Sequence, residues 1–254
     1  VDDDSPDRPD RDSIDDPSAT MDGTEGADLL EAPSDGTNIL MHGDLGDDTL
    51  VGNAGDDLIF GQGGDDILFG RGWSDRLFGG AGDDVMVAGN PEDSSDTEGA
   101  RNYLFGGAGD DTLFGSSGAD TLRGGQGDDS LIGGDGADVV KAGGGGDRVI
   151  AGDGAGSYDG GSGKDYLNTS EATGGLKLDL AAGTLSAKGL GANTLKAIEN
   201  VYGTDFADRM VGDGKDNRLY GFNKKDLIGG AGGNDTLLGG AGNDKIEGGA
   251  GDDK

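Results

Sequence analysis

The chain has 254 residues, of which 57 are glycine and none is cysteine, and its formal net charge at pH 7 is −32. The missing cysteines exclude disulfides and thiolate metal sites. The negative charge makes nucleic acids and anionic membranes poor partners, and no apolar run is long enough for a transmembrane helix. So acidic a chain repels itself strongly unless cations bind to it.

Residues 1–22 are acidic, carry proline and serine, and contain almost no apolar residues. This composition predicts a solvated linker or tail. A first repeat-like segment, GTEGADLLE, follows at Gly23–Glu31, and Ala32–His42 is irregular.

From Gly43 to Asn168 the chain repeats every nine residues in the pattern Gly-Gly-x-Gly-x-Asp-x-Leu-x, as in GGAGDDTLF at Gly106–Phe114. This strict period argues against the alternative of a flexible glycine-rich linker, which needs no register. The unit Ala88–Asp96 keeps the nine-residue length but loses the glycines and the apolar residue. We expect a deviating turn there that leaves the stack unbroken. The first repeat block is therefore predicted to span residues 23–168.

Residues 169–202 lack the repeat, and their LKLDL and LKAIENV segments alternate apolar and polar residues. This alternation predicts strands, so we interpret the segment as a strand-rich spacer. The repeat resumes at Gly203 and gives a second block over residues 203–254, with GGAGNDKIE at Gly239–Glu247 as a clear copy.

A single nine-residue unit cannot bury a core, but stacked units can. We expect two units to form one coil of eighteen residues, with the apolar residue at position eight of each unit pointing inward. The resulting fold class is an all-β solenoid of parallel strands. Its predicted core is Leu50, Ile59, Leu68, Leu77, Met86, Leu104, Leu113, Leu122 and Leu131.

The carboxylates at position six are predicted to line up along two opposite edges of the stack. One edge would carry Asp48, Asp66, Asp84, Asn102, Asp120 and Asp138, and the other Asp57, Asp75, Asp93, Asp111, Asp129, Asp147 and Asp165. Successive coils lie about 4.8 Å apart, so these carboxylates repel one another unless cations sit between them.

Carboxylate and carbonyl oxygens, without cysteine and with a single histidine, favour calcium over zinc, copper or magnesium. About a dozen Ca²⁺ ions would cancel most of the negative charge. Position five, as in Asp56, Asp65, Asp110 and Asn243, is a weaker candidate that faces solvent. The predicted metal ligands are Asp48, Asp57, Asp66, Asp75, Asp84, Asp111, Asp120, Asp129, Asp138, Asp147, Asp165, Asp208, Asp226, Asp235, Asp244 and Asp253.

These repeats resemble the RTX (repeats-in-toxin) family, and the resemblance covers roughly nine-tenths of the chain. TLKAIENVYGTDFAD at Thr194–Asp208 is similar to the spacer that joins repeat blocks in that family. The resemblance implies a right-handed parallel β-roll that folds on calcium outside a Gram-negative cell after type I secretion. Trp73, Gly156, Asn102 and Asn217 depart from the pattern, and we expect weak or empty sites there.

No catalytic constellation stands out. The single His42 excludes a two-histidine zinc helix, and no G-x-S-x-G elbow or Walker lysine motif occurs. We therefore expect a non-catalytic module. Two alternatives stay open: an extracellular adhesion, surface-assembly or polysaccharide-binding module, and an accessory domain of a secreted protease, lipase or epimerase.

Positions seven and nine flank the inward residue and point outward. On one face they are expected to form an apolar patch from Ile67, Phe69, Val85, Val87, Tyr103 and Phe105 that gives way to Arg123 and Lys141. Two interpretations of this patch stay open: a site for a protein partner or for self-association, or strand composition alone, because apolar residues suit strands anywhere.

Overall fold

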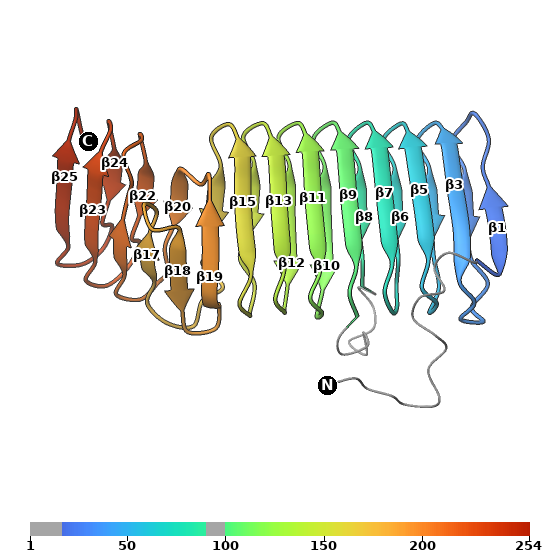
Figure 1. Ribbon diagram of the computed structural model, residues 1–254, viewed down its shortest axis with the longest axis horizontal. Coiled ribbons are helices and arrows are strands. Elements are labelled where there is room, and N and C mark those ends of the chain that lie inside the picture. Colours follow the sequence, from blue (N-terminus) through green and yellow to red (C-terminus); the bar gives the residue numbers. More distant parts are fainter. Residues whose placement is uncertain (1–16, 90–99) are drawn as a thin grey trace.

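The computed structural model describes residues 17–89 and 100–254. Within these residues the regular structure consists of strands, which form two long sheets along a rod (Figure 1). The fourteen-stranded sheet is called sheet A here and the eleven-stranded sheet is called sheet B. The predicted all-β parallel β-roll is confirmed.

Sheet A contains, in spatial order, β1 Ala19–Asp22, β3 Ile39–Leu45, β5 Leu58–Gly63, β7 Arg76–Ala81, β9 Tyr103–Ala108, β11 Thr121–Gln126, β13 Val139–Gly144, β15 Ser157–Ser162, β19 Gly191–Lys196, β18 Thr184–Ala187, β17 Lys177–Asp179, β21 Arg209–Val211, β23 Leu227–Gly232 and β25 Lys245–Ala250. Sheet B contains β2 Leu29–Glu31, β4 Thr49–Val51, β6 Ile67–Phe69, β8 Val85–Val87, β10 Thr112–Ser116, β12 Ser130–Gly134, β14 Arg148–Ile150, β16 Tyr166–Asn168, β20 Asn200–Tyr202, β22 Arg218–Tyr220 and β24 Thr236–Leu238.

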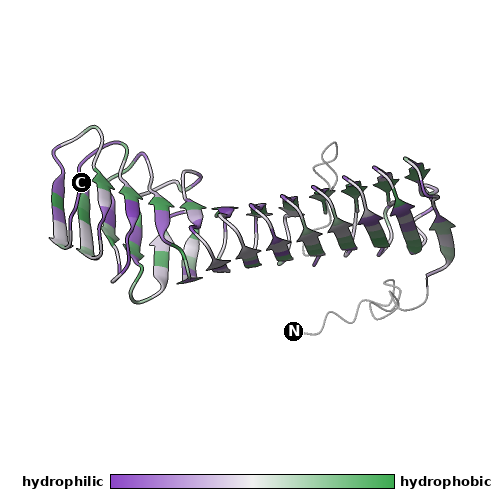
Figure 2. Ribbon diagram, turned by 90° about the horizontal axis from the view of Figure 1, so that it is seen from above, coloured by the Kyte–Doolittle hydropathy of each residue, from purple (hydrophilic) through white to green (hydrophobic). Residues whose placement is uncertain are grey.

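Each regular coil contributes one strand to each sheet, and like positions pair across coils. Leu113 of β10, for example, pairs with Leu131 of β12. All nine predicted core residues are completely buried between the sheets, and Figure 2 shows hydrophobic residues concentrated in the strands. One apolar side chain per nine residues is thus sufficient for a core, because every coil covers the next.

Between Gly43 and Asn168, the eighteen-residue spacing fails at one place. β7 pairs with β9 and β8 pairs with β10 at an offset of 27 residues, as in Leu77 with Leu104. Both sheets continue across this place, so the stack is unbroken, but the expectation that the nine-residue register holds without slippage from Gly43 to Asn168 is wrong. Residues 90–99 lie outside the described part of the chain, and the pairing passes over one complete unit.

This offset exchanges the two edges and the two outer faces beyond residue 99. Ile67, Phe69, Val85 and Val87 lie in sheet B, whereas Tyr103 and Phe105 lie in sheet A. The single apolar patch predicted from these residues is therefore wrong, because a one-unit shift moves every later strand to the opposite sheet. The predicted change from apolar to basic residues does occur along sheet A, because Phe105 pairs with Arg123 and Arg123 with Lys141.

The spacer is part of both sheets. β19 continues sheet A beside β15, and β20 continues sheet B beside β16. β18 pairs antiparallel with both β17 and β19, and β17 then pairs in parallel with β21. The strands expected for LKLDL and LKAIENV thus join the two repeat blocks by backbone hydrogen bonds.

At the N-terminal end, Ala19–Asp22 forms β1 beside β3, although we expected this segment within the acidic linker. Met21 packs against the hydrophobic core, which explains why a strand forms there. Residues 1–16 of that linker lie outside the described residues. Part of the irregular stretch, Ile39–His42, also belongs to a strand, with Met41 paired to Ile59 in the core.

Truncation of one core side chain in the middle of the rod tests this architecture. Leu122 is completely buried, so Leu122→Ala should lower the free energy of unfolding by about 2–5 kcal/mol. The matched control is Leu238→Ala at position nine, where the side chain is 47% exposed and the loss should be small. Chemical denaturation at saturating calcium measures both, and equal losses would contradict the inward placement of position eight.

Candidate metal-binding turns

The position-six residues lie in the turns between the two sheets. We call the side where the chain passes from sheet A to sheet B the A-to-B edge, and the opposite side the B-to-A edge. The A-to-B edge of the first block carries Asp48, Asp66, Asp84, Asp111, Asp129, Asp147 and Asp165. The B-to-A edge carries Asp57, Asp75, Asn102, Asp120 and Asp138.

The second block continues both edges. Asp208, Asp226 and Asp244 lie on the B-to-A edge, and Asp235 and Asp253 lie on the A-to-B edge. The structure therefore brings all sixteen predicted ligands into two rows. The composition of each row differs from our expectation, because the two rows exchange members at the 27-residue offset. Asp93, which we had placed in one row, lies outside the described residues.

Backbone amides hold these carboxylates in register from coil to coil. The Asp84 N–H donates to Oδ1 of Asp111 at 2.9 Å, and the Asp111 N–H donates to Oδ1 of Asp129 at 2.9 Å. The same bond recurs along both edges. Each position-six side chain is thus almost completely buried over most of the rod, with one oxygen fixed by the neighbouring coil.

The second carboxylate oxygen often has no partner. Oδ2 is buried without a hydrogen bond in Asp48, Asp66, Asp84, Asp111, Asp129, Asp138, Asp147, Asp165, Asp226 and Asp235. Leaving such an acceptor unsatisfied costs about 1–3 kcal/mol, and more for a charged group. So many buried, unpaired oxygens indicate a missing positive partner.

The atoms around these oxygens are acceptors too. A Cβ built on Gly106 would overlap Oδ2 of Asp111 and would lie 2.7 Å from the carbonyl oxygen of Gly124. The same cradle occurs at Gly61, where Oδ2 of Asp66 and the Gly79 carbonyl converge. Glycine at position one leaves this space open, and the space is lined by a carboxylate and a backbone carbonyl.

Two turn conformations occur, and the residue at position two distinguishes them. In what we call open turns, this residue has a positive φ, such as 133° at Gly125 and 69° at Phe222. Oδ2 of the aspartate four residues later accepts no bond from it. Asp44, Gln62, Arg71 and Ala231 also hold a positive φ at this position. A positive φ costs a non-glycine residue roughly 1–2 kcal/mol.

In what we call closed turns, the N–H of residue two donates to the position-six side chain of its own unit. Ser116 N–H donates to Oδ2 of Asp120 at 2.6 Å, and Asn53 N–H donates to Oδ2 of Asp57 at 2.7 Å. Thr204, Thr24 and Asp213 make the equivalent bonds to Asp208, Asp28 and Asn217. None of these five donors has a positive φ.

Short polar side chains stabilise the closed turns. Asn53 Oδ1 accepts from the Gly55 N–H, Thr204 Oγ1 from the Phe206 N–H, and Asp213 Oδ1 from the Lys215 N–H. Such local bonds are typical of Asn, Asp, Ser and Thr in turns. The type of residue at position two does not by itself determine the conformation of the turn, because Asp44 lies in an open turn and Asp213 in a closed one.

Uncharged residues occupy several ligand positions, as expected from the sequence. Asn102 donates from Nδ2 to Oδ1 of Asp120 at 3.2 Å, and Gly156 has no side chain. Asn217 donates from Nδ2 to the Glu199 carbonyl oxygen at 3.2 Å. At these positions the amide or the missing side chain replaces the negative charge that a cation would need.

A second carboxylate ladder was not foreseen. Oδ1 of Asp65 accepts from the Asp83 N–H at 2.8 Å, and Oδ1 of Asp83 accepts from the Asp110 N–H at 2.8 Å. These position-five side chains are exposed or half-buried and each satisfies a backbone amide of the next coil. The regular recurrence of aspartate at position five is the sequence signal that could have revealed this ladder.

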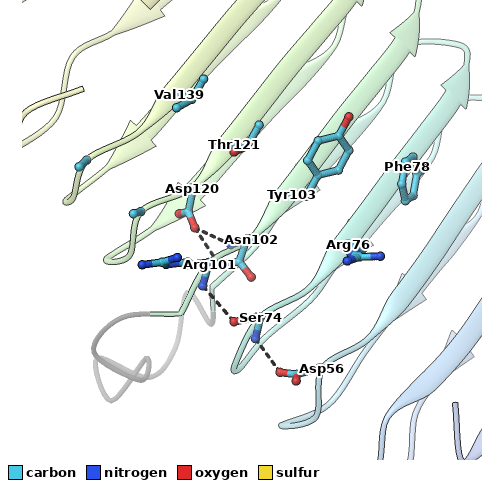
Figure 3. A pocket seen from close by; sticks show the side chains of 12 residues that line it. Asp56, Ser74, Arg76, Phe78, Arg101, Asn102, Tyr103, Asp120, Thr121 and Val139 are labelled. Atoms are coloured by element: carbon cyan, nitrogen blue, oxygen red, sulfur yellow. Dashed lines mark hydrogen bonds between the residues drawn. The ribbon is translucent and has the colours of Figure 1, made fainter. Parts of the chain in front are cut away.

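A surface depression of about 940 Å³ lies over the B-to-A edge (Figure 3). Arg76, Phe78, Arg101 and Tyr103 contribute to its lining, beside Asp120. The Arg101 N–H donates to Ser74 Oγ at 3.0 Å. The depression thus combines arginine and aromatic side chains with Asp56 and Asp120 of the acidic turns.

A model of the RTX calcium-binding nonapeptide repeat matches this chain over residues 42–72, 74–90, 96–131, 123–158, 132–167, 202–237 and 229–254. The chain belongs to this RTX repeat family. A search of curated proteins gave no match. The family's calcium-binding character agrees with the buried carboxylates found at the turns.

The geometry of the turns fits a hard cation bound largely by carbonyl oxygens. Among the described residues, no three acidic, histidine or cysteine side chains converge on one point. A cation between two coils must therefore take backbone carbonyls together with the aspartate oxygens. Calcium accepts six to eight oxygen ligands in flexible geometry, which suits such a cradle.

Burial also changes the acidity of these carboxylates. Desolvation raises the pKa of Asp84, Asp111, Asp129 and Asp138 to about 7, with neighbouring carboxylates adding to the shift. Without a cation the folded roll therefore holds protons that the unfolded chain releases above its ordinary pKa of 3.8. Calcium and protons compete for the same oxygens.

Lower pH should therefore stabilise the calcium-free roll but weaken its binding of calcium. Because the folded-state pKa values are raised, the calcium-free roll loses stability as the pH rises from about 4 to about 7, and chelated protein should show more β-structure at pH 5.5 than at pH 8. The apparent calcium affinity should fall over the same range as the pH is lowered. Circular dichroism during calcium titrations at both pH values measures this, and a pH-independent affinity would contradict it.

Proposed function

We propose that this chain is a calcium-binding β-roll that folds when it meets calcium outside the cell, and that it serves as a non-catalytic module of a type I secreted protein. The observation that carries the proposal is the set of buried, unpartnered Oδ2 atoms in turns lined by further acceptors. Membership of the RTX repeat family supports calcium as the ion.

Calcium binding and folding are coupled because the sites exist only when coils stack. In the unfolded chain the aspartates of neighbouring coils are 18 or 27 residues apart, as the Asp66–Asp84 and Asp84–Asp111 bonds show. Metal-binding free energy then becomes folding free energy. A chain that is unfolded where calcium is scarce and folded where it is abundant suits export in an extended state.

The location outside the cell is consistent with several features. The chain has no cysteine and a net charge of −32, and among residues 17–89 and 100–254 no helix is long and apolar enough to cross a bilayer. Extracellular calcium modules bind at about 10⁻⁴–10⁻³ M. A Gram-negative origin is part of the proposal.

Calcium-dependent folding is directly testable. With excess chelator at pH 7.5, circular dichroism should show an unfolded chain, and calcium at about 10⁻⁴–10⁻³ M should restore β-structure. Magnesium at the same concentrations is the control and should restore little, because it keeps its waters and prefers octahedral geometry. Unchanged β-structure in chelator would disprove the coupling.

An extracellular binding or assembly module is the second candidate, and the outer face of sheet B favours it. Its position-nine residues form an apolar row in which Phe69 pairs with Val87, and Phe114 with both Val87 and Ile132. Protein partners, self-association and an accessory role beside a secreted protease, lipase or epimerase would all use such a face.

Substitutions in one sheet at a time can test whether the apolar row of sheet B contacts a partner or only reflects the preference of strands for apolar residues. If sheet B carries a contact, Phe69→Lys with Phe114→Lys should abolish self-association in sedimentation velocity without changing calcium uptake. The matched control is Phe60→Lys with Phe78→Lys on the outer face of sheet A, where the two rings stack at 4.9 Å. Identical sedimentation of parent and both variants would identify the row as strand composition only.

A further inference from the structure

The open and closed turns are not distributed evenly between the two edges. On the A-to-B edge, the open turns form an unbroken series. Oδ2 is buried without a partner in every position-six carboxylate from Asp48 to Asp165, namely Asp48, Asp66, Asp84, Asp111, Asp129, Asp147 and Asp165.

The B-to-A edge is interrupted. Asp57, Asp120 and Asp208 lie in closed turns, Asn102 is neutral, and Gly156 has no side chain. Within the first block, open turns occur there only between such interruptions, as at Asp138, and in the second block Asp226 and Asp244 lie in two consecutive open turns. Figure 3 shows this edge at Asp120, whose carboxylate is bonded to Asn102 of the preceding coil.

Resting on the proposed function, we propose that calcium fills a continuous row on the A-to-B edge, and that a closed turn excludes calcium because the N–H of residue two occupies the carboxylate oxygen that the ion needs. Residue two is then the residue that determines whether a repeat binds calcium. The predicted ligands Asp57, Asp120 and Asp208 have a structural role in place of a metal-binding one.

The physical reason is charge. An N–H group presents a positive end to Oδ2, so a cation placed in a closed turn would meet that N–H and repel it. In an open turn, Oδ2 and the nearby carbonyl are both acceptors, and a cation satisfies both. The closed turns at Asp57 and Asp120 are as deeply buried as the open turn at Asp129. Burial alone therefore does not separate the two classes.

The strained residues agree with this assignment. Phe222, Gln62 and Arg71 hold a positive φ at position two, although glycine is the residue that tolerates it. Binding of a cation would offset that strain. At Asn53, Ser116 and Thr204 the closed turn avoids the strain and satisfies Oδ2 internally.

The test compares two isosteric substitutions at equally buried aspartates, 1% exposed each: Asp129→Asn in an open turn and Asp120→Asn in a closed one. Isothermal titration calorimetry and equilibrium dialysis with Ca²⁺ alone should show that Asp129→Asn loses at least one ion and raises the calcium midpoint of folding several-fold. Asp120→Asn should keep the parent stoichiometry. Equal losses in both variants would overturn the assignment of the edges.

A gain-of-binding variant guards against simple misfolding. Asn53→Gly removes the side chain that accepts from Gly55 and lets residue 53 take a positive φ. The carbonyl oxygen of Gly70 already lies beside Gly52, as it would in an open turn, and Asp75 stands in the next coil. This variant should bind one calcium more than the parent. An unchanged stoichiometry would overturn the role of residue two.

These outcomes are distinct from failure of the proposed function. If the parent protein binds no calcium and its fold is indifferent to chelator, the function itself is wrong. If the parent folds on calcium but Asp120→Asn loses as many ions as Asp129→Asn, the calcium function stands and the one-edge row is wrong.

Discussion

Repulsion between stacked carboxylates is the constraint on which this structure depends. Each coil places an aspartate directly over that of the next coil, and the amide bond from Asp111 to Asp129 fixes the stack at hydrogen-bonding distance. The core beneath consists of two files of side chains, one from each sheet, and Leu113 and Leu131 are neighbours in the file of sheet B. A backbone N–H reaches the second carboxylate oxygen in the closed turns and a lysine reaches it at Glu199, whereas in the open turns this oxygen has no partner from the protein.

Most of the architecture follows from the nine-residue period. The period places one apolar residue inward in every unit, so the core from Leu50 to Leu131 was predicted correctly from spacing alone. Spacing failed at Ala88–Asp96, because that unit has the right length without the glycines and leucine that make a coil. The nine-residue length of a unit fixes the pairing of later strands only when the unit also has the glycines and the apolar residue of a coil. Because of this one-unit shift, every residue of the first block beyond it was assigned to the wrong edge or face, including Tyr103 and Phe105.

The conformation of each turn was harder to predict. Position six is aspartate in both the Asp120 and Asp129 units, and both side chains are buried. The difference lies four residues earlier, where Ser116 can donate to the carboxylate and Gly125 turns away with φ 133°. Glycine at that position looks like one more member of a glycine-rich pattern, and serine looks like a tolerated substitution. Only the backbone hydrogen bond reveals that the substitution changes which group satisfies the carboxylate.

The spacer shows a third solution to the same electrostatic problem. Glu199 lies on the A-to-B edge one coil beyond Asp165, and its Oε2 accepts from the Asp165 N–H at 3.2 Å, as an aspartate Oδ1 does elsewhere in the row. Its other oxygen, Oε1, lies 2.7 Å from Lys215 Nζ, and this bond raises the pKa of the Lys215 ammonium. A fixed ammonium thus supplies at Glu199 the positive partner that Oδ2 lacks in the open turns. With Asn217 neutral in the following turn, two consecutive A-to-B turns at the junction of the repeat blocks carry no unpaired negative charge.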